Sequence, residues 1–262
     1  MTDRERALAF LRETYRRRAE TVEAHPWGEL VLTPSLPRVW DANFAIVDRW
    51  PGTARELRHE LDRVHRDAGL THRRSVILDQ ELGDRLWNDV VALGWEFASR
   101  YVVMAQRRPP DRAADPAIEV VGVGELDWAH GRRAMIATEP FGHDDELGAQ
   151  LVELDRRLGR TMEVRHFGAI ADREVASYAG LYLEDGVAQI EDVATLEEFR
   201  GRGLARAVVL AAADQARRSG AELVFLVADE RDWPQDLYRR LGFDPIGREH
   251  VFGRSGRQHV PS

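Results

Sequence analysis

One segment constrains the fold of this chain more than any other: residues 191–220, which read EDVATLEEFRGRGLARAVVLAAADQARRSG. A strand is predicted to end at Thr195, and a helix is predicted to begin at Gly203, directly after a loop of glycine and arginine. Glycines let the backbone approach a ligand closely, and the uncapped amides and positive dipole at the start of a helix favour an anion. Such a loop can equally be plain surface, but its geometry suits a pyrophosphate.

The composition removes several classes of chemistry. All 37 basic residues are arginine, and there is no cysteine. A Walker-type phosphate loop, a kinase and a Schiff-base enzyme each need a lysine amine, so none of them fits. Cysteine nucleophiles, thiolate zinc sites and disulfides are excluded in the same way.

The charge balance indicates which partners to expect. With 45 acidic residues against 37 basic ones, the net charge is −8. This argues against nucleic acid and mildly favours a cationic small molecule. The charged first 18 residues lack the apolar stretch of a signal peptide, and no apolar run is long enough for a membrane span. We therefore expect a cytoplasmic protein that binds neither membrane nor nucleic acid; its oligomeric state stays open, a homodimer included.

A proline-rich segment, residues 107–117, is typical of a linker. It predicts an N-terminal domain over residues 1–112 and a C-terminal domain over residues 113–262. Helices and strands alternate in the first domain, which is an α/β order. Its five tryptophans are expected to pack its sheet. The predicted elements are helices at 4–24, 54–67 and 80–93 and strands at 28–33, 74–79 and 97–106.

The second domain is predicted to be a mixed α/β sheet with an antiparallel meander. Asp172-Arg173-Glu174 and Asp185-Gly186 are expected to form its tight turns. The predicted strands are 118–124, 162–171, 174–184, 186–195, 222–228 and a final pair, 243–249 and 250–254; the predicted helices are 125–137, 144–159, 203–219 and 234–242.

Downstream of the glycine loop comes a second motif, L-Y-x-x-L-G-F, which includes Tyr238. The order strand, R-x-x-G-x-A, helix, strand and this motif resembles the GCN5-related N-acetyltransferase (GNAT) superfamily over roughly residues 117–254. The family's phosphate signature, Q/R-x-x-G-x-G/A, is met by Arg200, Gly203 and Ala205. The resemblance implies a GNAT fold in the C-terminal half.

The resemblance also implies a cofactor, acetyl-CoA or another acyl-CoA; from the spacing of the histidines, no metal is expected. Its pyrophosphate would lie on the amides of the glycine loop, and its pantetheine arm beside a strand opened by a bulge. Where many members carry an Asn, this chain has Arg231 and Asp232, so that contact is in doubt. The implied cofactor-binding residues are Val193, Ala194, Thr195, Arg200, Gly201, Arg202, Gly203, Leu204, Ala205, Arg206 and Asp232.

Acyl transfer to an amine needs a proton for the thiolate, a donor for the oxyanion and a base for the amine. By resemblance, Tyr238 is the general acid and a backbone amide near Val193 the oxyanion donor. Glu191 is the candidate base. Regular alternation places Glu191 and Asp192 on opposite faces of a strand, unless the bulge turns both. An alternative is that neither is a base and the pair attracts a cationic amine; Tyr238 could likewise be a packing aromatic.

The loop of residues 138–145 lies where family members build the acceptor pocket. A protonated amine would suit this loop, which offers acidic residues, including Glu139 and Asp144, and the apolar Phe141. Asp192, outside the loop, is a further candidate substrate-binding residue. A solvated loop with a capping Asp explains the same pattern. His143 beside two carboxylates does not have the spacing of a metal site.

A faint echo links the halves: Leu93-Gly94-Trp95 resembles Leu241-Gly242-Phe243, and the first half lacks R-x-x-G-x-G/A. The N-terminal half is therefore expected to be a degenerate, partial GNAT-like domain, as in tandem members. We expect an N-acetyltransferase acting from acetyl-CoA on a primary amine of a small cationic acceptor. The alternatives are a non-catalytic acyl-CoA-binding or sensing protein and a protein–protein module.

Overall fold

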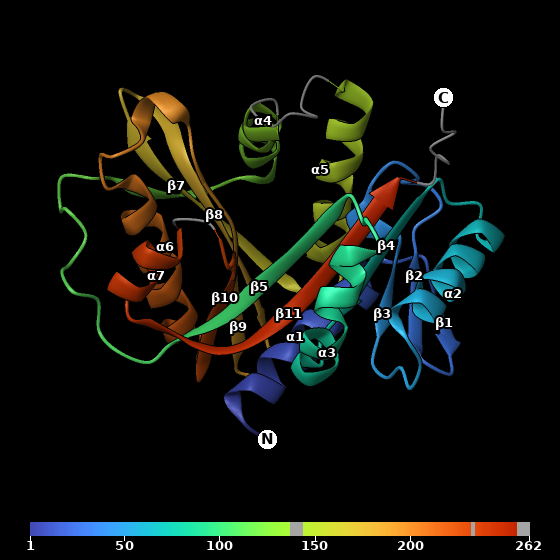
Figure 1. The fold of residues 1–262 in the computed structure, drawn as a ribbon. Helices are drawn as coiled ribbons and strands as arrows, with labels where there is room; N and C mark the ends of the chain where they lie inside the picture. The colour runs from blue at the N-terminus through green and yellow to red at the C-terminus, as the bar shows by residue number, and fades with distance from the viewer. Residues whose placement is uncertain (137–143, 232–233, 256–262) are drawn as a thin grey trace. The chain divides into compact units, whose positions relative to one another are not determined.

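The computed structural model describes residues 1–136, 144–231 and 234–255 (Figure 1). The chain forms two units, each treated separately below. Unit 1 contains Met1–Phe10, Val103–Ala228 and Asp232–Ile246, and unit 2 contains Leu11–Val102, Asp229–Arg231 and Gly247–Ser262. Both units thus draw on both ends of the chain. The predicted domain boundary between residues 112 and 113 stays a prediction.

Unit 1 holds the meander and the glycine loop. Its sheet has the strand order β11-β5-β10-β9-β8-β7-β6. Neighbouring strands from β6 to β9 are antiparallel, whereas β10 runs parallel to β9 and is connected to it through α6. Its elements are β6 (Val120–Val123), α4 (Glu125–Ile136), α5 (Asp145–Gly159), β7 (Glu163–Ala171), β8 (Glu174–Glu184), β9 (Val187–Thr195), η2 (Glu197–Phe199), α6 (Leu204–Arg218), β10 (Leu223–Asp229) and α7 (Pro234–Arg240).

Two hairpin turns set the register of the meander. Asp172 and Arg173 have φ angles of 50° and 74°, and Asp185 and Gly186 have 46° and 74°. Two consecutive positive φ angles are the mark of the type I′ turn that suits antiparallel strands. Both predicted turns are confirmed, and they bring β7, β8 and β9 into one sheet.

Unit 2 has the strand order β1-β2-β3-β4-β11. Here too a parallel pair, β3 and β4, is connected through a helix, α2. Its elements are β1 (Thr21–His25), β2 (Gly28–Leu32), η1 (Trp40–Ala42), β3 (Phe44–Val47), α2 (Ala54–Asp67), β4 (His72–Ile77) and α3 (Gln80–Ala92). Four elements divide their residues between the units: α1 (Asp3–Arg18), β5 (Phe97–Gln106), β10 and β11 (Phe243–Ser255).

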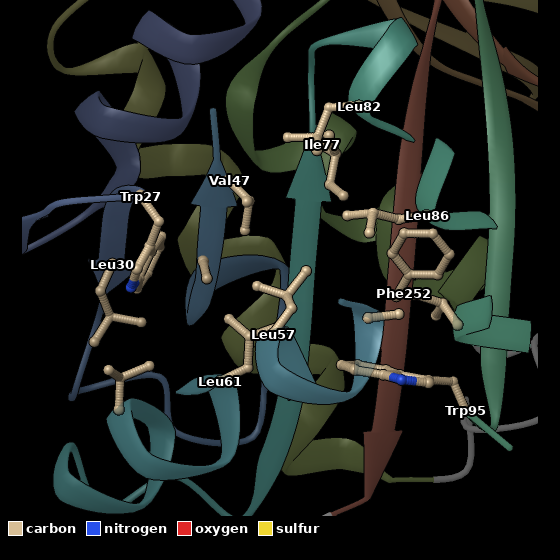
Figure 2. Close-up of a cluster of buried hydrophobic side chains, with 14 of the residues drawn as sticks. Trp27, Leu30, Val47, Leu57, Leu61, Ile77, Leu82, Leu86, Trp95 and Phe252 are labelled. Carbon is tan, nitrogen blue, oxygen red and sulfur yellow. The ribbon is translucent and has the colours of Figure 1, made fainter. Parts of the chain in front are cut away.

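The core of unit 2 is a mostly aliphatic cluster into which tryptophans pack. Trp27 and Trp95 are buried in a cluster with Phe252 (Figure 2). Trp50 and Trp87 are partly buried and pack against this cluster. Trp40 stacks on His72 with ring centroids 5.1 Å apart. The expected role of the five tryptophans in packing this sheet is confirmed.

Two predicted elements are wrong. The first helix ends at Arg18, and Thr21–His25 forms β1, an exposed strand paired with β2. The β-branched Thr21 and Val22 favour a strand over a helix, and pairing with β2 decides the outcome. The final strand pair is one continuous strand, β11. The strand runs without a break through the predicted boundary between Glu249 and His250, because β4 pairs with its second half.

Candidate active site

The glycine loop has the geometry of an anion site. Gly201 and Gly203 have φ angles of 78° and 84°, and Gly203 is the N-cap of α6 without any side-chain cap. Among the described residues, the backbone amides of residues 201–205 appear in no hydrogen bond. Because the first amides of a helix have no partner within it, this loop presents several donors at the positive end of the α6 dipole. The donors fit a pyrophosphate.

The three arginines of the loop have different surroundings. Arg200 is exposed and donates its Nε to the Thr195 carbonyl at 3.3 Å. The half-exposed Arg202 pairs with Asp172 at 3.1 Å. Arg206, by contrast, is buried, and its Nη1 donates to Asp111 Oδ1 at 2.6 Å and to the Arg112 carbonyl at 3.0 Å. Arg200 and Arg202 are therefore placed to meet a ligand, whereas Arg206 holds the linker against α6.

A gap opens beside this loop because β9 and β10 diverge. Their parallel pairing runs from Val187 opposite Leu223 to Ile190 opposite Leu226 and then stops. Both strands continue, β9 to Thr195 and β10 to Asp229. The last residues of β9 keep β8 as a partner on one edge but have no β10 partner on the other. An extended ligand can pair with this free edge, as an added strand would.

The predicted bulge is present in β9. Tyr178 lies opposite Ala194 and Gly180 opposite Glu191, so three steps along β9 match two along β8. Asp192 has a φ of 53°, the left-handed conformation that costs a non-glycine residue roughly 1–2 kcal/mol. The extra residue on β9 defines a β-bulge.

The bulge turns both carboxylates to one face. Residues directly opposite in an antiparallel pair share a face. Gln189 lies opposite Tyr182, and its side-chain amide donates to Glu191 Oε2. The Tyr182 hydroxyl donates to Asp192 Oδ2 at 3.3 Å. Glu191 and Asp192 therefore both lie on the Tyr182 face, the outcome that regular alternation alone would forbid.

Asp192 belongs to a charged cluster that the sequence did not reveal. Its Oδ1 lies 3.0 Å from Nη2 of Arg132, on α4, and Nε of Arg132 lies 3.2 Å from Asp155 Oδ2, on α5. The charge of Asp192, and then that of Asp155, raises the pKa of the Arg132 guanidinium above its ordinary value. We call Arg132, Asp155, Tyr182 and Asp192 the Arg132 cluster. No spacing in the sequence links these residues, since they come from four different elements.

Tyr238, the candidate acid, is buried on α7, and its ring meets that of Phe243 edge-on at 6.3 Å. The following turn is fixed by the linker: the amides of Arg107 and Arg108 donate to the Gly242 carbonyl at 2.9 and 3.2 Å. Gly242 has a φ of 88°, and a Cβ there would lie 1.9 Å from the Arg108 carbonyl oxygen. Glycine is required at this turn, which positions the helix that carries Tyr238.

Other predicted site residues are partly outside the described structure. Glu139, Phe141 and Asp232 lie outside the described residues. Asp144 caps α5 by accepting the Leu147 amide at 3.0 Å, which is the capping role considered above. Over the described ranges, no group of three or more His, Cys, Asp or Glu could hold a metal ion. His143 lies outside those ranges, so the absence of a metal stays a prediction.

A cavity of about 660 Å³ lies in unit 1 where β6, β7 and the end of α5 meet. Trp128 and His166 line it and stack with centroids 4.2 Å apart. Asp155 also lines the cavity, so the Arg132 cluster borders the cavity at this residue. Its arginines are Arg156, Arg160 and Arg165. The candidate residues Glu191 and Asp192 lie instead on β9, beside the gap between β9 and β10.

Comparison with known proteins agrees with this geometry. Residues 131–243, which carry the bulge, the glycine loop and Tyr238, match the model of the acetyltransferase (GNAT) family. This part of the chain belongs to the GNAT family. A relative, the "Uncharacterized N-acetyltransferase YobR" of Bacillus subtilis (strain 168), is 34% identical over 67 residues. That match covers 25% of this chain and only 27% of the relative.

Solved structures share the fold over nearly the whole length. A functionally unknown conserved protein from Staphylococcus epidermidis ATCC 12228 matches with a TM-score of 0.71 at 16% identity, covering 90% of this chain and 94% of the other. A GCN5-related N-acetyltransferase from Kribbella flavida has a TM-score of 0.63 at 14% identity, covering 97% and 96%. A tandem GNAT protein from the clavulanic acid biosynthesis pathway has 0.58 at 19%, covering 90% and 79%. The predicted mixed α/β fold, a GNAT fold with a partial GNAT-like N-terminal part, is confirmed.

The helices of the described residues include none with the length and apolar character needed to cross a membrane. The cytoplasmic location stays a prediction.

Proposed function

We propose that this GNAT protein is an N-acyltransferase that moves the acetyl group of acetyl-CoA onto a primary amine of a small, cationic acceptor. One observation carries the proposal: the gap between β9 and β10 opens beside the glycine loop, where amide donors collect at the start of α6. An anion on the loop and an extended arm along the edge of β9 match the two ends of a CoA molecule.

The proposed reaction is direct. The amine nitrogen attacks the thioester carbonyl carbon, and the tetrahedral intermediate collapses as the C–S bond breaks. Glu191 takes the proton lost by the amine, directly or through water, and Tyr238 gives a proton to the departing thiolate. The backbone amide at Val193, beyond the bulge, is the proposed donor to the oxyanion. No covalent enzyme intermediate is needed, which agrees with a chain without lysine or cysteine.

The cationic acceptor rests on fewer carboxylates than the sequence suggested. Asp192 is already paired with Arg132, and Asp144 caps α5. Glu191 lies next to Asp192 on β9 with intermediate exposure and accepts the side-chain amide of Gln189. Glu191 is the carboxylate that we propose meets the protonated amine.

Calorimetric titration with acetyl-CoA tests the cofactor half of the proposal, and Gly201 and Gly220 offer a matched pair. Both have positive φ, lie near opposite ends of α6, and would meet nothing within 4 Å of an added Cβ. Alanine at either position should cost similar stability, about 1–2 kcal/mol. Only Gly201→Ala should weaken acetyl-CoA binding. Equal affinities for the two variants, or no binding by the wild type at millimolar cofactor, would exclude the loop as the cofactor site.

Turnover with a panel of amines tests the catalytic half. Tyr238→Phe should lower kcat by roughly 10²-fold or more while leaving acetyl-CoA affinity nearly unchanged. An unchanged rate would remove Tyr238 as the acid. Tight cofactor binding with no transfer to any amine would favour the second candidate, a non-catalytic acyl-CoA-binding or sensing protein.

A further inference from the structure

The conformation of Asp192 needs an explanation within the fold. Four described residues other than glycine have positive φ angles: Asp172, Arg173, Asp185 and Asp192. The first three lie in hairpin turns, where the turn type itself requires that conformation. Asp192 lies within a strand, so contacts from outside β9 must hold it in the left-handed region.

Arg132 supplies the strongest of those contacts. The carboxylate of Asp192 is engaged on both oxygens, by Nη2 of Arg132 at 3.0 Å and by the Tyr182 hydroxyl at 3.3 Å. The side chains of Arg132 and Asp192 are only 22% and 15% exposed. A shielded ion pair with two further hydrogen-bonding partners is rigid, because each group has few alternatives.

Arg132 is itself held from two sides. Asp155, whose side chain is 9% exposed, fixes its Nε at 3.2 Å. The preceding residue, Gly131, permits α4 to lie directly on β8, since a Cβ there would stand 2.2 Å from Cζ of Tyr178. Tyr178 is the last residue of β8 paired before the bulge, opposite Ala194. Helix α4 therefore meets the sheet at the bulge, with Arg132 facing Asp192.

We propose that Arg132 is a positioning residue: through Asp192 it holds the bulge that turns Glu191 toward the gap and frees the Val193 amide from β8. This inference rests on the proposed acyl transfer at the same site. It also assigns Asp192 a role other than acceptor binding, because its carboxylate is used within the protein.

A set of variants separates positioning from direct binding. Arg132→Met should lower kcat by about tenfold or more, with the KM of the acceptor changed little. Asp192→Gly removes the charge but makes the left-handed conformation free of strain, so it should keep most of the activity. The double variant Arg132→Met/Asp192→Gly should then be more active than Arg132→Met alone. Asp192→Val, whose β-branched side chain resists positive φ, should be the least active single variant.

Arg133→Met is the matched control, since Arg133 is the exposed neighbour on the same helix. It should behave as wild type in every assay. Hydrogen exchange of the Val193 amide gives a readout that needs no substrate. Because the bulge frees this amide from β8, loss of the bulge lets it pair with β8, so its exchange should slow by about tenfold or more in Arg132→Met but not in Arg133→Met.

The outcomes separate this inference from the proposed function. If the wild type transfers no acetyl group, the proposed function fails, and the exchange rates still decide whether Arg132 holds the bulge. Unchanged exchange in Arg132→Met would overturn the inference. So would a raised acceptor KM at constant kcat, or a double variant as slow as Arg132→Met alone, because both would indicate direct contact of Arg132 with the acceptor.

Discussion

The two units build the same crossover, a strand, a helix and a parallel strand, but they finish the start of the helix differently. In unit 1, α6 begins at a glycine with no side-chain cap. In unit 2, α2 begins with a capping box: Thr53 Oγ1 accepts the Glu56 amide at 3.3 Å, and Glu56 Oε2 accepts the Thr53 amide at 2.8 Å. Helix α2 thus has a negatively charged group, the Glu56 carboxylate, at its own N-terminus.

This difference explains why the start of α6 suits an anion and the start of α2 does not. The amides that would bind a phosphate are used by the capping box, and the carboxylate of Glu56 already stands at the positive end of the dipole. The hydrogen bonds from Thr53 also hold the pKa of Glu56 below its ordinary value, so it is charged at neutral pH. A phosphate group at the start of α2 would be repelled by the negative charge of Glu56.

The largest expected effect on stability concerns a similar leucine–glycine turn that each unit contains, at Gly242 in unit 1 and at Gly94 in unit 2. Gly242→Ala should reduce the free energy of unfolding by more than about 3 kcal/mol, because strain at positive φ adds to the collision with the Arg108 carbonyl. Gly94→Ala should lose only about 1–2 kcal/mol, since Gly94 has a φ of 71° and open space around it. Denaturant titration of both variants measures the difference. Equal losses would show that the linker does not fix the turn in unit 1.

The next effect is a pH dependence specific to unit 2. His65 and His72 are fully buried, and desolvation lowers the pKa of each to about 4. Between about pH 6.5 and 4 the unfolded chain therefore binds more protons than the folded one, so stability falls as the pH drops, by on the order of 3 kcal/mol per histidine.

A third buried group in unit 2, Glu249, shifts the pH dependence of stability in the opposite direction. Burial raises the pKa of Glu249 to about 7, so its contribution to stability is complete below the ordinary pKa of Glu and is lost as the pH rises through 7.

The effect of the histidines can be tested with His65→Gln. Unfolding followed by tryptophan fluorescence should show a flatter decline of stability below pH 6.5 in His65→Gln than in the wild type. A parallel decline in the two proteins would contradict the assignment.

A smaller effect, on acetyl-CoA affinity, is expected when a negatively charged side chain is introduced at the N-terminus of α6. Gly203→Asp and Gly203→Asn share the same backbone strain, and both residue types tolerate positive φ better than most. The Asp variant should bind acetyl-CoA up to about 30-fold more weakly than the Asn variant, which corresponds to about 2 kcal/mol of dipole and charge effects. Calorimetry on the pair measures the ratio. Identical affinities would mean that the phosphates do not lie at this helix end.

The smallest effect is expected from opening α2. Thr53→Ala removes the capping box and should cost about 1 kcal/mol of stability, with no change in acetyl-CoA affinity. Thermal unfolding and calorimetry together check it. A gain of a second CoA site would show that the cap alone kept unit 2 from binding.

The sequence predicted the features that depend on local chemistry. The helix start at Gly203 and the two hairpin turns are each determined by a few neighbouring residues, and both were found as predicted. The bulge was expected only by resemblance. What it does to Asp192 depends on Arg132, 60 positions earlier, and on close packing of α4 at Gly131.

Other features could not be predicted because distant partners decide them. Thr21–His25 becomes a strand because β2 pairs with it, and β11 stays continuous because β4 pairs with its second half. Arg206 directly follows the phosphate motif and was expected to bind the cofactor, yet it binds Asp111 of the linker. A motif identifies residue types, but the partners of a charged side chain depend on the assembled fold.

The most direct test of the account compares the two helix starts in one experiment. Two-dimensional amide NMR during titration with acetyl-CoA should shift the Gly201, Arg202 and Gly203 amides and leave those of Thr53 and Glu56 in place. Shifts at Thr53 and Glu56, or unmoved amides at Gly201 and Gly203 under saturating cofactor, would contradict it.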